Sequence, residues 1–466
     1  MTGSTPGDVQ LLRAIRYELA RYVGPVAAEG KAATTMRMVD DALAHIIMRR
    51  ERGDDWQADD NAALQDLLAE DAVKPQAADT LAEGNRLMAA LEHRLSGAQD
   101  GAEPMLLGLN RLHRRATERA QAFARADFDA YAAQRETLED KVTADRFQAY
   151  LRRRFPGRDA LVTDFRELSG GFSKTTFMVE VAGLEAEPCS IVVKRDMAAS
   201  ATRTSAVDEF PLLRGLFDAG ILVPEPLWTE TDPEQLGYPF LVMRRVAGNT
   251  AGTLFGLSED CTEQVVRDLA AQLGKLHGLD PRAIDLGPAF AHIADPHAEM
   301  LAEVERWRSL WLETRQAPDP LLAGAMRWLE THVPPLPERL SIVHGDPGFQ
   351  NQLCAGGHLT ALIDWEFTHA GDPIENLSFL RPFIEQRLPW AEFMAIYQAH
   401  GGGAYDDELG AYYRVWHGVR FTVCTLLANR AFCTDENPEL RMGHCGIVAY
   451  QPIVVECGAM VDHLLT

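Results

Sequence analysis

One stretch of the chain, residues 342–372, carries polar side chains at a spacing that suits very few folds. It reads IVHGDPGFQNQLCAGGHLTALIDWEFTHAGD. Asp346 and Asn351 lie on one loop after a short apolar run, and Asp364 follows a second apolar run. Phosphoryl transfer needs a base that orients the attacking hydroxyl, and hard oxygen ligands that hold Mg²⁺ on nucleotide phosphates. An Asp, an Asn five residues later and an Asp thirteen residues further supply that set.

The two motifs in this stretch, HGDxxxxN and IDWE, resemble those of the aminoglycoside phosphotransferase-like family, the small-molecule relatives of protein kinases. The resemblance covers about residues 143–466 and implies an enzyme that uses ATP and Mg²⁺. It also implies an α+β, bilobal, protein-kinase-like fold, with a small β-rich lobe and a large helical lobe. The residues it places in the site are Asp346 as catalytic base, His344 as the residue that orients the catalytic loop, Asn351 and Asp364 as Mg²⁺ ligands, and Glu366 and Asp372 in support.

A glycine-containing turn upstream predicts where the nucleotide phosphates bind. Two glycines allow a close backbone approach to phosphate oxygens, although Gly-Gly is also an ordinary hairpin turn. The residues of this turn that we expect to bind the cofactor are Gly170, Gly171, Ser173, Lys174 and Thr175.

A lysine at the end of the apolar run IVVK is the second part of the predicted nucleotide site. Lys194 comes 23 residues after Gly171, and the resemblance implies that it contacts the α- and β-phosphates. Its expected partner is Glu209, with Asp208 as the alternative. Pro211 departs from a clean helix at this point and leaves the pairing open, because proline kinks a helix interior.

The segment PFLVMRRVAG, residues 239–248, resembles the last strand of the small lobe running into the hinge, where backbone groups read the adenine. Met243, Arg244 and Val246 are the candidate cofactor-binding residues there. The segment LAAQLGKLHGLD, residues 269–280, resembles a helix of the large lobe, and we expect its histidine, His277, to be structural.

The chain divides near residue 140. We predict an all-α accessory domain over 1–140, a β-rich, nucleotide-binding lobe over 141–246 and a helical, catalytic and acceptor-binding lobe over 247–466. Apolar residues recur at helical spacing in the first part, beginning with Leu11 to Tyr22, and a polar break is expected at Arg52–Asp55. In the second part we predict strands at 161–168, 176–181, 190–194 and 240–246, helices at 144–155 and 210–219, and a hairpin-like pair of 341–343 with 359–364.

Charge and cysteine content exclude several classes of protein. Acidic residues outnumber basic residues, 68 to 45, so the formal net charge is −23. Such a surface repels phosphate backbones, and we expect no nucleic-acid or membrane partner. The seven cysteines form no CxxC pair, and no basic and apolar leader opens the chain, so we expect reduced thiols and a cytoplasmic protein. The Walker motif GxxxxGK[ST], the dinucleotide motif GxGxxG and the motifs GxSxG and HExxH are also missing from the sequence.

The acceptor remains open at this level. The motif IDWEFTHAGDP resembles that of one branch of the family, which is fused to, or neighbours, acyl-CoA dehydrogenases. That resemblance implies a hydroxyacyl-CoA substrate. The pair Glu375-Asn376 departs from the usual motif of the branch. The helical first part resembles a domain that accompanies such kinases, and its arginines are candidates for binding an anionic tail: Arg111, Arg114, Arg115 and Arg119. An antibiotic (aminoglycoside or macrolide) phosphotransferase is the alternative, favoured by acidic residues of the C-terminal region: Glu385, Asp406, Asp407, Glu408, Asp435, Glu436 and Glu439. A nucleotide-binding pseudokinase that acts as an interaction module is a further alternative.

Overall fold

The computed structural model describes most of the chain. The described residues are 30–68, 80–97, 103–128, 142–168, 171, 173–185, 189–197, 202, 204–253, 256–287, 290, 296–315, 318–336, 340–433 and 450–465. The chain forms two compact units. Unit 1 consists of Met1–Leu138, Val304–His332 and Val415–Thr466, and unit 2 consists of Glu139–Glu303 and Val333–Arg414.

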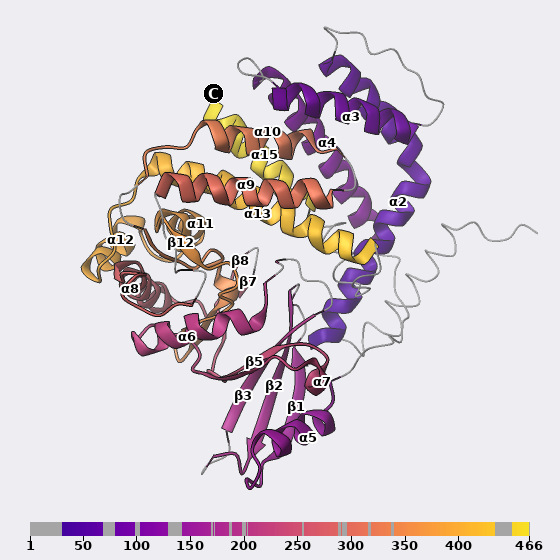
Figure 1. The fold of residues 1–466 in the computed structure, drawn as a ribbon. Helices are drawn as coiled ribbons and strands as arrows, with labels where there is room; N and C mark the ends of the chain where they lie inside the picture. Colours follow the sequence, from indigo (N-terminus) through magenta and orange to yellow (C-terminus); the bar gives the residue numbers. More distant parts are fainter. Residues whose placement is uncertain are drawn as a thin grey trace, which may run out of the picture. The chain divides into compact units, whose positions relative to one another are not determined.

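The first part of unit 2 is an antiparallel sheet of five strands in the order β1-β2-β3-β5-β4. Because side chains alternate along a strand, the sheet has two different faces. Phe177, Ile191 and Val242 pack on the face covered by helix α5. Met243 packs on the other face, with apolar residues of α6. The elements are α5 (Ala144–Arg154), β1 (Leu161–Leu168), β2 (Lys174–Ala182), β3 (Cys189–Asp196), α6 (Glu209–Asp218), β4 (Pro226–Glu230), α7 (Pro233–Leu236) and β5 (Phe240–Arg244) (Figure 1).

The second part of unit 2 is mainly helical and carries the motif stretch on short strands. Its elements are β6 (Asn249–Thr250), β7 (Gly252–Thr253), β8 (Gly256–Leu257), α8 (Glu263–Gly278), β9 (Ser341–Val343), β10 (Gln352–Ala355), β11 (His358–Leu362), β12 (His369–Gly371), α11 (Ile374–Ile384) and α12 (Trp390–Ala399). The α+β kinase-like fold class predicted from the sequence is confirmed.

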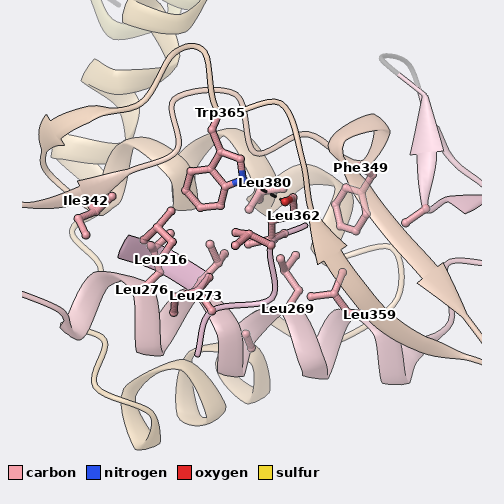
Figure 2. Packing of buried hydrophobic residues seen from close by; sticks show 14 of the residues in the cluster. Leu216, Leu269, Leu273, Leu276, Ile342, Phe349, Leu359, Leu362, Trp365 and Leu380 are labelled. Atoms are coloured by element: carbon pink, nitrogen blue, oxygen red, sulfur yellow. Dashed lines mark hydrogen bonds between the residues drawn. The ribbon is translucent and has the colours of Figure 1, made fainter. Parts of the chain in front are cut away.

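Buried apolar residues on both sides of the polar residues anchor the motif stretch to helix α8. Leu269, Leu273 and Leu276 of α8 recur at helical spacing and face the same cluster as Ile342, Phe349, Leu362 and Trp365 (Figure 2). Trp365 also donates its indole N–H to the carbonyl oxygen of Leu362, at 3.0 Å. The loops that hold the polar side chains are therefore fixed at both ends by the core.

The expected hairpin of 341–343 with 359–364 is wrong. Strand β9 pairs with β12, and β11 pairs with β10. The turn between β10 and β11 is Gly356-Gly357, in which both residues have positive φ, 59° and 80°. A two-residue turn of this kind matches the twist of antiparallel strands, so it joins the adjacent strands β10 and β11. Strand β9 therefore pairs with β12, which comes later in the chain.

Unit 1 combines helices from both ends of the chain. Its described helices are α2 (Gly30–Leu67), α3 (Thr80–Gly97), α4 (Glu103–Phe128), α10 (Pro320–Thr331) and α15 (Tyr450–Leu465), and it shares α9 (Pro296–Thr314) and α13 (Asp407–Cys433) with unit 2. Asn110 of α4 donates to the carbonyl oxygen of Gly458 in α15, at 2.8 Å. Glu92 of α3 accepts the backbone N–H of Asp319 at the start of α10, at 3.0 Å. The domain boundaries at 140 and 246 stay predictions.

Helix α2 differs from its sequence-based expectation. It continues without interruption through 52–55, where a polar break was expected. Polar side chains can occupy the solvent face of a helix, and one glycine in a helix costs only about 1 kcal/mol. The helix expected over Leu11 to Tyr22 lies outside the described residues.

Two observations complete the fold. Within the described ranges, every helix is too short or too polar to cross a membrane. Among the described residues, five buried cysteines form no disulfide: Cys189, Cys261, Cys354, Cys424 and Cys457.

Candidate active site

Lys194 lies at the centre of a buried ion-paired cluster in unit 2. Its Nζ atom donates to Glu209 Oε1 at 2.8 Å and to Asp364 Oδ1 at 2.6 Å. The lysine belongs to β3, and its side chain is on the sheet face that α6 covers. The structure thus joins a residue of the small lobe to a residue of the IDWE motif, 170 positions apart.

Glu209, not Asp208, is the partner of Lys194 in the structure. Glu209 is the first residue of α6, and Asp208 lies in the preceding 3₁₀ turn. Pro211 therefore falls in the first turn of α6, where its missing N–H and fixed φ are tolerated. The proline that left the pairing open is compatible with the helix that presents Glu209.

The charges of this cluster shift one another's proton affinity. Burial lowers the pKa of Lys194, but Asp364 and Glu209 raise it more, so the pKa rises overall. Burial raises the pKa of Glu209 to about 7, with partial compensation by Lys194. Burial also raises the pKa of Asp364, but the hydrogen-bonded Lys194 outweighs it and the pKa falls. Lys194 and Asp364 are therefore both charged at neutral pH.

Asp346 has both carboxylate oxygens held by side-chain amides. Asn351 donates through Nδ2 to Oδ2 at 2.9 Å, and also to the backbone carbonyl oxygen of Asp346 at 2.9 Å. Gln350 donates to Oδ1 at 3.2 Å. Asp346 is buried, with 9% of its residue surface exposed. Its position and orientation are therefore set by the loop that carries it.

His344 connects the two halves of the motif stretch from inside the core. Its Nε2 donates to the carbonyl oxygen of Ile363 at 3.1 Å, and its Nδ1 accepts the backbone N–H of Asp346 at 3.4 Å. Burial lowers the pKa of His344 to about 4, so the ring is neutral at pH 7. The geometry suits a residue that orients the catalytic loop.

Asp364 adopts a backbone conformation that is unusual for a residue with a side chain. Its φ is 68°, in the left-handed region. Asp and Asn are several-fold enriched there compared with other non-glycine residues, and the strain is typically about 1–3 kcal/mol. The backbone N–H of the preceding residue, Ile363, donates to the carbonyl oxygen of Asn351 at 2.9 Å. That bond brings the backbones at the two predicted metal ligands, Asn351 and Asp364, close together.

The predicted phosphate-binding turn is tied to the IDWE motif through Glu366. Ser173 donates to Glu366 Oε1 at 2.7 Å, and Lys174 Nζ lies 3.6 Å from Oε2. Thr202 donates to Oε2 at 3.2 Å. Burial and the nearby charge of Asp364 raise the pKa of Glu366. Glu366 therefore connects the turn to the cluster around Lys194.

The other residues of the turn have different environments. A Cβ atom at Gly171 would lie 2.4 Å from the carbonyl oxygen of Lys174, so the turn requires glycine there. Thr175 is buried in β2, opposite Arg195. Gly170 lies outside the described residues.

The residues predicted to lie at the adenine are Met243 and Arg244, at the end of β5, and Val246, two residues beyond the strand. Met243 is buried in the core, and Val246 is half-buried beyond the strand. Arg244 is engaged by two carboxylates, Glu225 at 2.8 Å and Glu185 at 2.9 Å. The backbone N–H groups of Arg244 and Arg245 also donate within the sheet. A role for Arg244 in nucleotide binding would therefore have to use its carbonyl group or displace these contacts.

Sequence reasoning missed Asn376, which contacts the catalytic loop, and Tyr397, which contacts His277. Asn376 accepts the backbone N–H of Gly345 at 3.1 Å, and Tyr397 bonds His277 at 2.9 Å. The only signal was the Glu375-Asn376 departure noted in the sequence. Asp372, expected as a supporting carboxylate, caps α11 by accepting the N–H of Ile374 at 2.8 Å. Burial raises its pKa to about 6.

Comparisons with known proteins show the family of the chain. Residues 164–421, more than half of the chain, match the phosphotransferase enzyme family, APH. Acyl-CoA dehydrogenase family member 11 of Gallus gallus is 25% identical over 238 residues, which are 49% of this chain and 29% of that protein. Hygromycin-B 4-O-kinase of Escherichia coli is 26% identical over 267 residues, 52% of this chain and 69% of that protein.

The fold is also similar to that of a protein of known structure. It comes from Ralstonia eutropha and is described as a candidate aminoglycoside phosphotransferase; it has a TM-score of 0.51 and 16% identity, and covers 69% of this chain and 98% of its own. The chain spans less than a third of the length of the acyl-CoA dehydrogenase relative. The resemblance predicted from HGDxxxxN and IDWE is confirmed: this chain belongs to the phosphotransferase enzyme family.

Proposed function

We propose that this chain is an ATP- and Mg²⁺-dependent kinase that transfers the γ-phosphoryl group to a hydroxyl of a small molecule. One observation carries the proposal: the ion-paired Lys194 and the amide-held Asp346 belong to the same unit and are linked through Asp364 and Asn351. These are the parts that phosphoryl transfer needs, because its catalysis is mainly positioning and charge stabilisation.

Each residue has a separate task in the proposed reaction. Asp346 accepts the proton of the attacking hydroxyl as that oxygen bonds to the γ-phosphorus and the bond between the γ-phosphorus and the bridging oxygen breaks, which leaves ADP. Lys194 offers its charge to the α- and β-phosphates, and Glu209 holds the lysine in place. Ser173 belongs to the turn that would cover the phosphates.

The donor atoms near Asp346 fit a magnesium ion. Both N–H groups of Asn351 Nδ2 are used by Asp346, which leaves the oxygen Oδ1 for a metal. Asp364 Oδ1 accepts from Lys194, which leaves Oδ2. Within the described part of the chain, no cluster of three or more His, Cys, Asp or Glu side chains could hold a metal. Mg²⁺ is commonly held by one or two protein oxygens together with substrate phosphates and water, so Asn351 and Asp364 would suffice when nucleotide is bound.

Replacement of Asp364 by Asn should raise the Mg²⁺ concentration that gives half-maximal turnover and lower the maximal turnover. The variant removes one negative charge from the metal ligand, yet Asn tolerates the left-handed φ of 68° that an alanine would strain. The measurement is initial rate against free Mg²⁺ at saturating nucleotide.

The matched control is Glu408→Gln, the same type of change at an exposed carboxylate of unit 2. It should leave the Mg²⁺ dependence unchanged. An Asp364→Asn variant with the wild-type Mg²⁺ dependence would remove Asp364 from the metal site.

For the acceptor we propose a hydroxyl on an acyl thioester. The support is the motif IDWEFTHAGDP together with relatives whose names place them among acyl-CoA dehydrogenase proteins. The arginines of α4 add little to this argument. Arg119 is held by Asp60 in a two-point contact at 2.9 and 3.0 Å and packs on Trp56, while Arg114 and Arg115 are exposed.

An antibiotic acceptor is the second candidate, because Hygromycin-B 4-O-kinase is among the relatives. The acidic residues that would favour a cationic antibiotic are partly engaged. Glu385 and Asp407 both bond Arg381, at 3.1 and 2.5 Å, and Asp406 accepts the N–H of Leu409. Asp435, Glu436 and Glu439 lie outside the described residues. The observed contacts therefore weaken the argument for a cationic antibiotic.

A substrate panel tests both acceptors. With Mg-ATP and either 4-hydroxyacyl-CoA species or kanamycin-type antibiotics, we expect phosphorylation of the thioester, detected as a phosphate added to its mass. Phosphorylation of the antibiotic alone would overturn the thioester proposal and keep the kinase.

The same panel tests the pseudokinase alternative. A pure nucleotide binder would raise its melting temperature with Mg-ATP but transfer nothing to any acceptor. That result would overturn the kinase proposal as a whole.

A further inference from the structure

The carboxylate of Glu366 is surrounded by donors from two segments of the small lobe. Ser173, in the turn before β2, donates to Oε1 at 2.7 Å, and Thr202, in the loop between β3 and α6, donates to Oε2 at 3.2 Å. Lys174 Nζ lies 3.6 Å from Oε2. All three donor residues are buried. Two hydroxyl groups and one ammonium group thus converge on a single anion, and we call these three residues the donor cradle.

The donor cradle has contacts of its own that do not involve Glu366. Lys174 Nζ also donates to the backbone carbonyl oxygen of Thr204 and, at 3.3 Å, to the hydroxyl group of the same residue. The hydroxyl oxygens of Thr202 and Thr204 lie 2.8 Å apart. Lys174 is the first residue of β2, and Ser173 directly precedes it. The donors are therefore held in place by the sheet and the loop, whether or not the glutamate is between them.

Glu366 is less firmly held than the residues around it. It lies in a turn outside the helices and strands, after Trp365, which is buried in the core. Within the described part of the chain, its hydrogen bonds and its ion pair all go to the donor cradle. A glutamate side chain can rotate about several single bonds while its backbone stays fixed. The carboxylate can therefore leave the cradle without any movement of the core.

A nucleotide phosphate would seek the same donors. Carboxylates and phosphates both accept charge-assisted hydrogen bonds from hydroxyl and ammonium groups. Asp364, the proposed metal ligand, precedes Glu366 by two residues, so a nucleotide bound through that metal has its phosphates near the cradle. Two like charges at such a distance repel each other strongly in a buried site. The phosphate and the Glu366 carboxylate therefore cannot share the cradle.

We infer that Ser173, Lys174 and Thr202 form an anion site for a phosphate group of the nucleotide, and that Glu366 occupies this site until the nucleotide displaces its carboxylate. The inference rests on the kinase function proposed above. Glu366 is then an internal competitor of the nucleotide, and its return to the cradle after transfer favours the release of ADP. Thr202, which no motif indicated, joins the phosphate site.

Glu366→Gln is the first variant of the test. It keeps the shape of the side chain but removes the charge that holds it against Lys174. We expect the dissociation constants of Mg-AMP-PNP, and of ADP in the presence of EDTA, to fall roughly 5–20-fold, because an occupied site lowers apparent affinity by the fraction of molecules in which it is free. Isothermal titration calorimetry on the full chain measures both, and ADP without metal separates competition from metal binding.

The matched control is Glu180→Gln, at the other end of β2. Glu180 also accepts from a serine, Ser190, and also pairs with a cation, Arg245 at 3.1 Å, but outside the cradle. This control should leave both dissociation constants unchanged. The melting temperature without nucleotide shows that each variant is folded.

Lys174→Met is the second variant, made both in the wild type and in Glu366→Gln. In the wild type Lys174 exchanges one anion for another when nucleotide binds, so its loss should raise the dissociation constant of ADP only about 2–3-fold. In Glu366→Gln the lysine gains an anionic partner only with the nucleotide, so the same change should cost roughly tenfold or more. An effect of overall charge alone would give equal losses in the two backgrounds.

Three results would overturn the inference while the kinase proposal stands. Weaker nucleotide binding in Glu366→Gln would make the carboxylate a partner of the nucleotide or of its metal, and unchanged binding would show that it never leaves the cradle. Equal losses for Lys174→Met in the two backgrounds would show that the lysine and the glutamate do not share one site. A wild-type chain that binds neither nucleotide would overturn the kinase proposal and this inference together.

Discussion

Replacement of Asp346 by Asn should lower kcat by a factor of roughly 10²–10⁴, the usual worth of a positioned base, and leave nucleotide binding nearly unchanged. The variant keeps the shape of the side chain but cannot accept a proton at neutral pH. Turnover under conditions where chemistry limits the rate is the measurement, together with nucleotide affinity from the shift in melting temperature.

The structure shows how loss of the base can be separated from displacement of the side chain. Both oxygens of Asp346 accept from amides, Gln350 and Asn351, so the new NH₂ group faces a donor unless the Gln350 amide turns over. Adding Gln350→Glu gives that NH₂ group an acceptor. If Asp346 is the base, the double variant should stay as inactive as Asp346→Asn. Recovery of turnover in the double variant would mean that the single change only moved the side chain.

Replacement of Lys194 by Met should abolish most turnover and also destabilise the fold. It leaves Glu209 and Asp364 without the cation between them, and removal of one partner of a buried ion pair typically costs about 3–5 kcal/mol. The lower end of that range applies here because the Asp364 side chain is 37% exposed. Urea unfolding measures the free energy of unfolding, and the initial rate at varied ATP measures nucleotide use.

The control for Lys194→Met is the double variant with Glu209→Gln. Glu209→Gln removes the buried carboxyl that has lost its cation, so part of the lost free energy of unfolding should return. Turnover should not return, because no cation is left for the α- and β-phosphates. Unchanged nucleotide affinity and turnover in Lys194→Met would contradict the assignment of Lys194. A double variant no more stable than Lys194→Met would show that the unpaired Glu209 carboxyl was not the cause.

The residues of the motif stretch could be predicted because their chemistry depends on short spacings. Asp346 and Asn351 share one loop, and a single hairpin separates that loop from Asp364. Lys194 and Glu209 are 15 positions apart on consecutive elements. Even in this stretch the pairing of β9 was predicted wrongly, although Gly356-Gly357 signalled that the turn belongs between β10 and β11.

Contacts over long separations could not be predicted in the same way. His277 and Asn376 are 99 positions apart, and each alone is an ordinary polar residue of a helix. Glu366 meets Ser173 across 193 positions. The local sequence of either segment does not predict these two contacts, because they result from how the core places α8, α11 and the sheet. The same reason applies to the N-terminal helices, whose periodicity predicted helices but not their packing against α10 and α15.

The composition of unit 1 from both ends of the chain has a consequence for synthesis on the ribosome. Helices α3 and α4 are complete once residue 128 has been made, but α15, which packs against α4, begins only at Tyr450. At about 5–20 residues per second the N-terminal helices wait roughly 15–60 s for that partner. Unit 2 ends at Arg414, so all of its residues emerge before unit 1 is complete. The nascent chain therefore holds an unfinished helical surface after every residue of the unit that bears the proposed catalytic residues has been made.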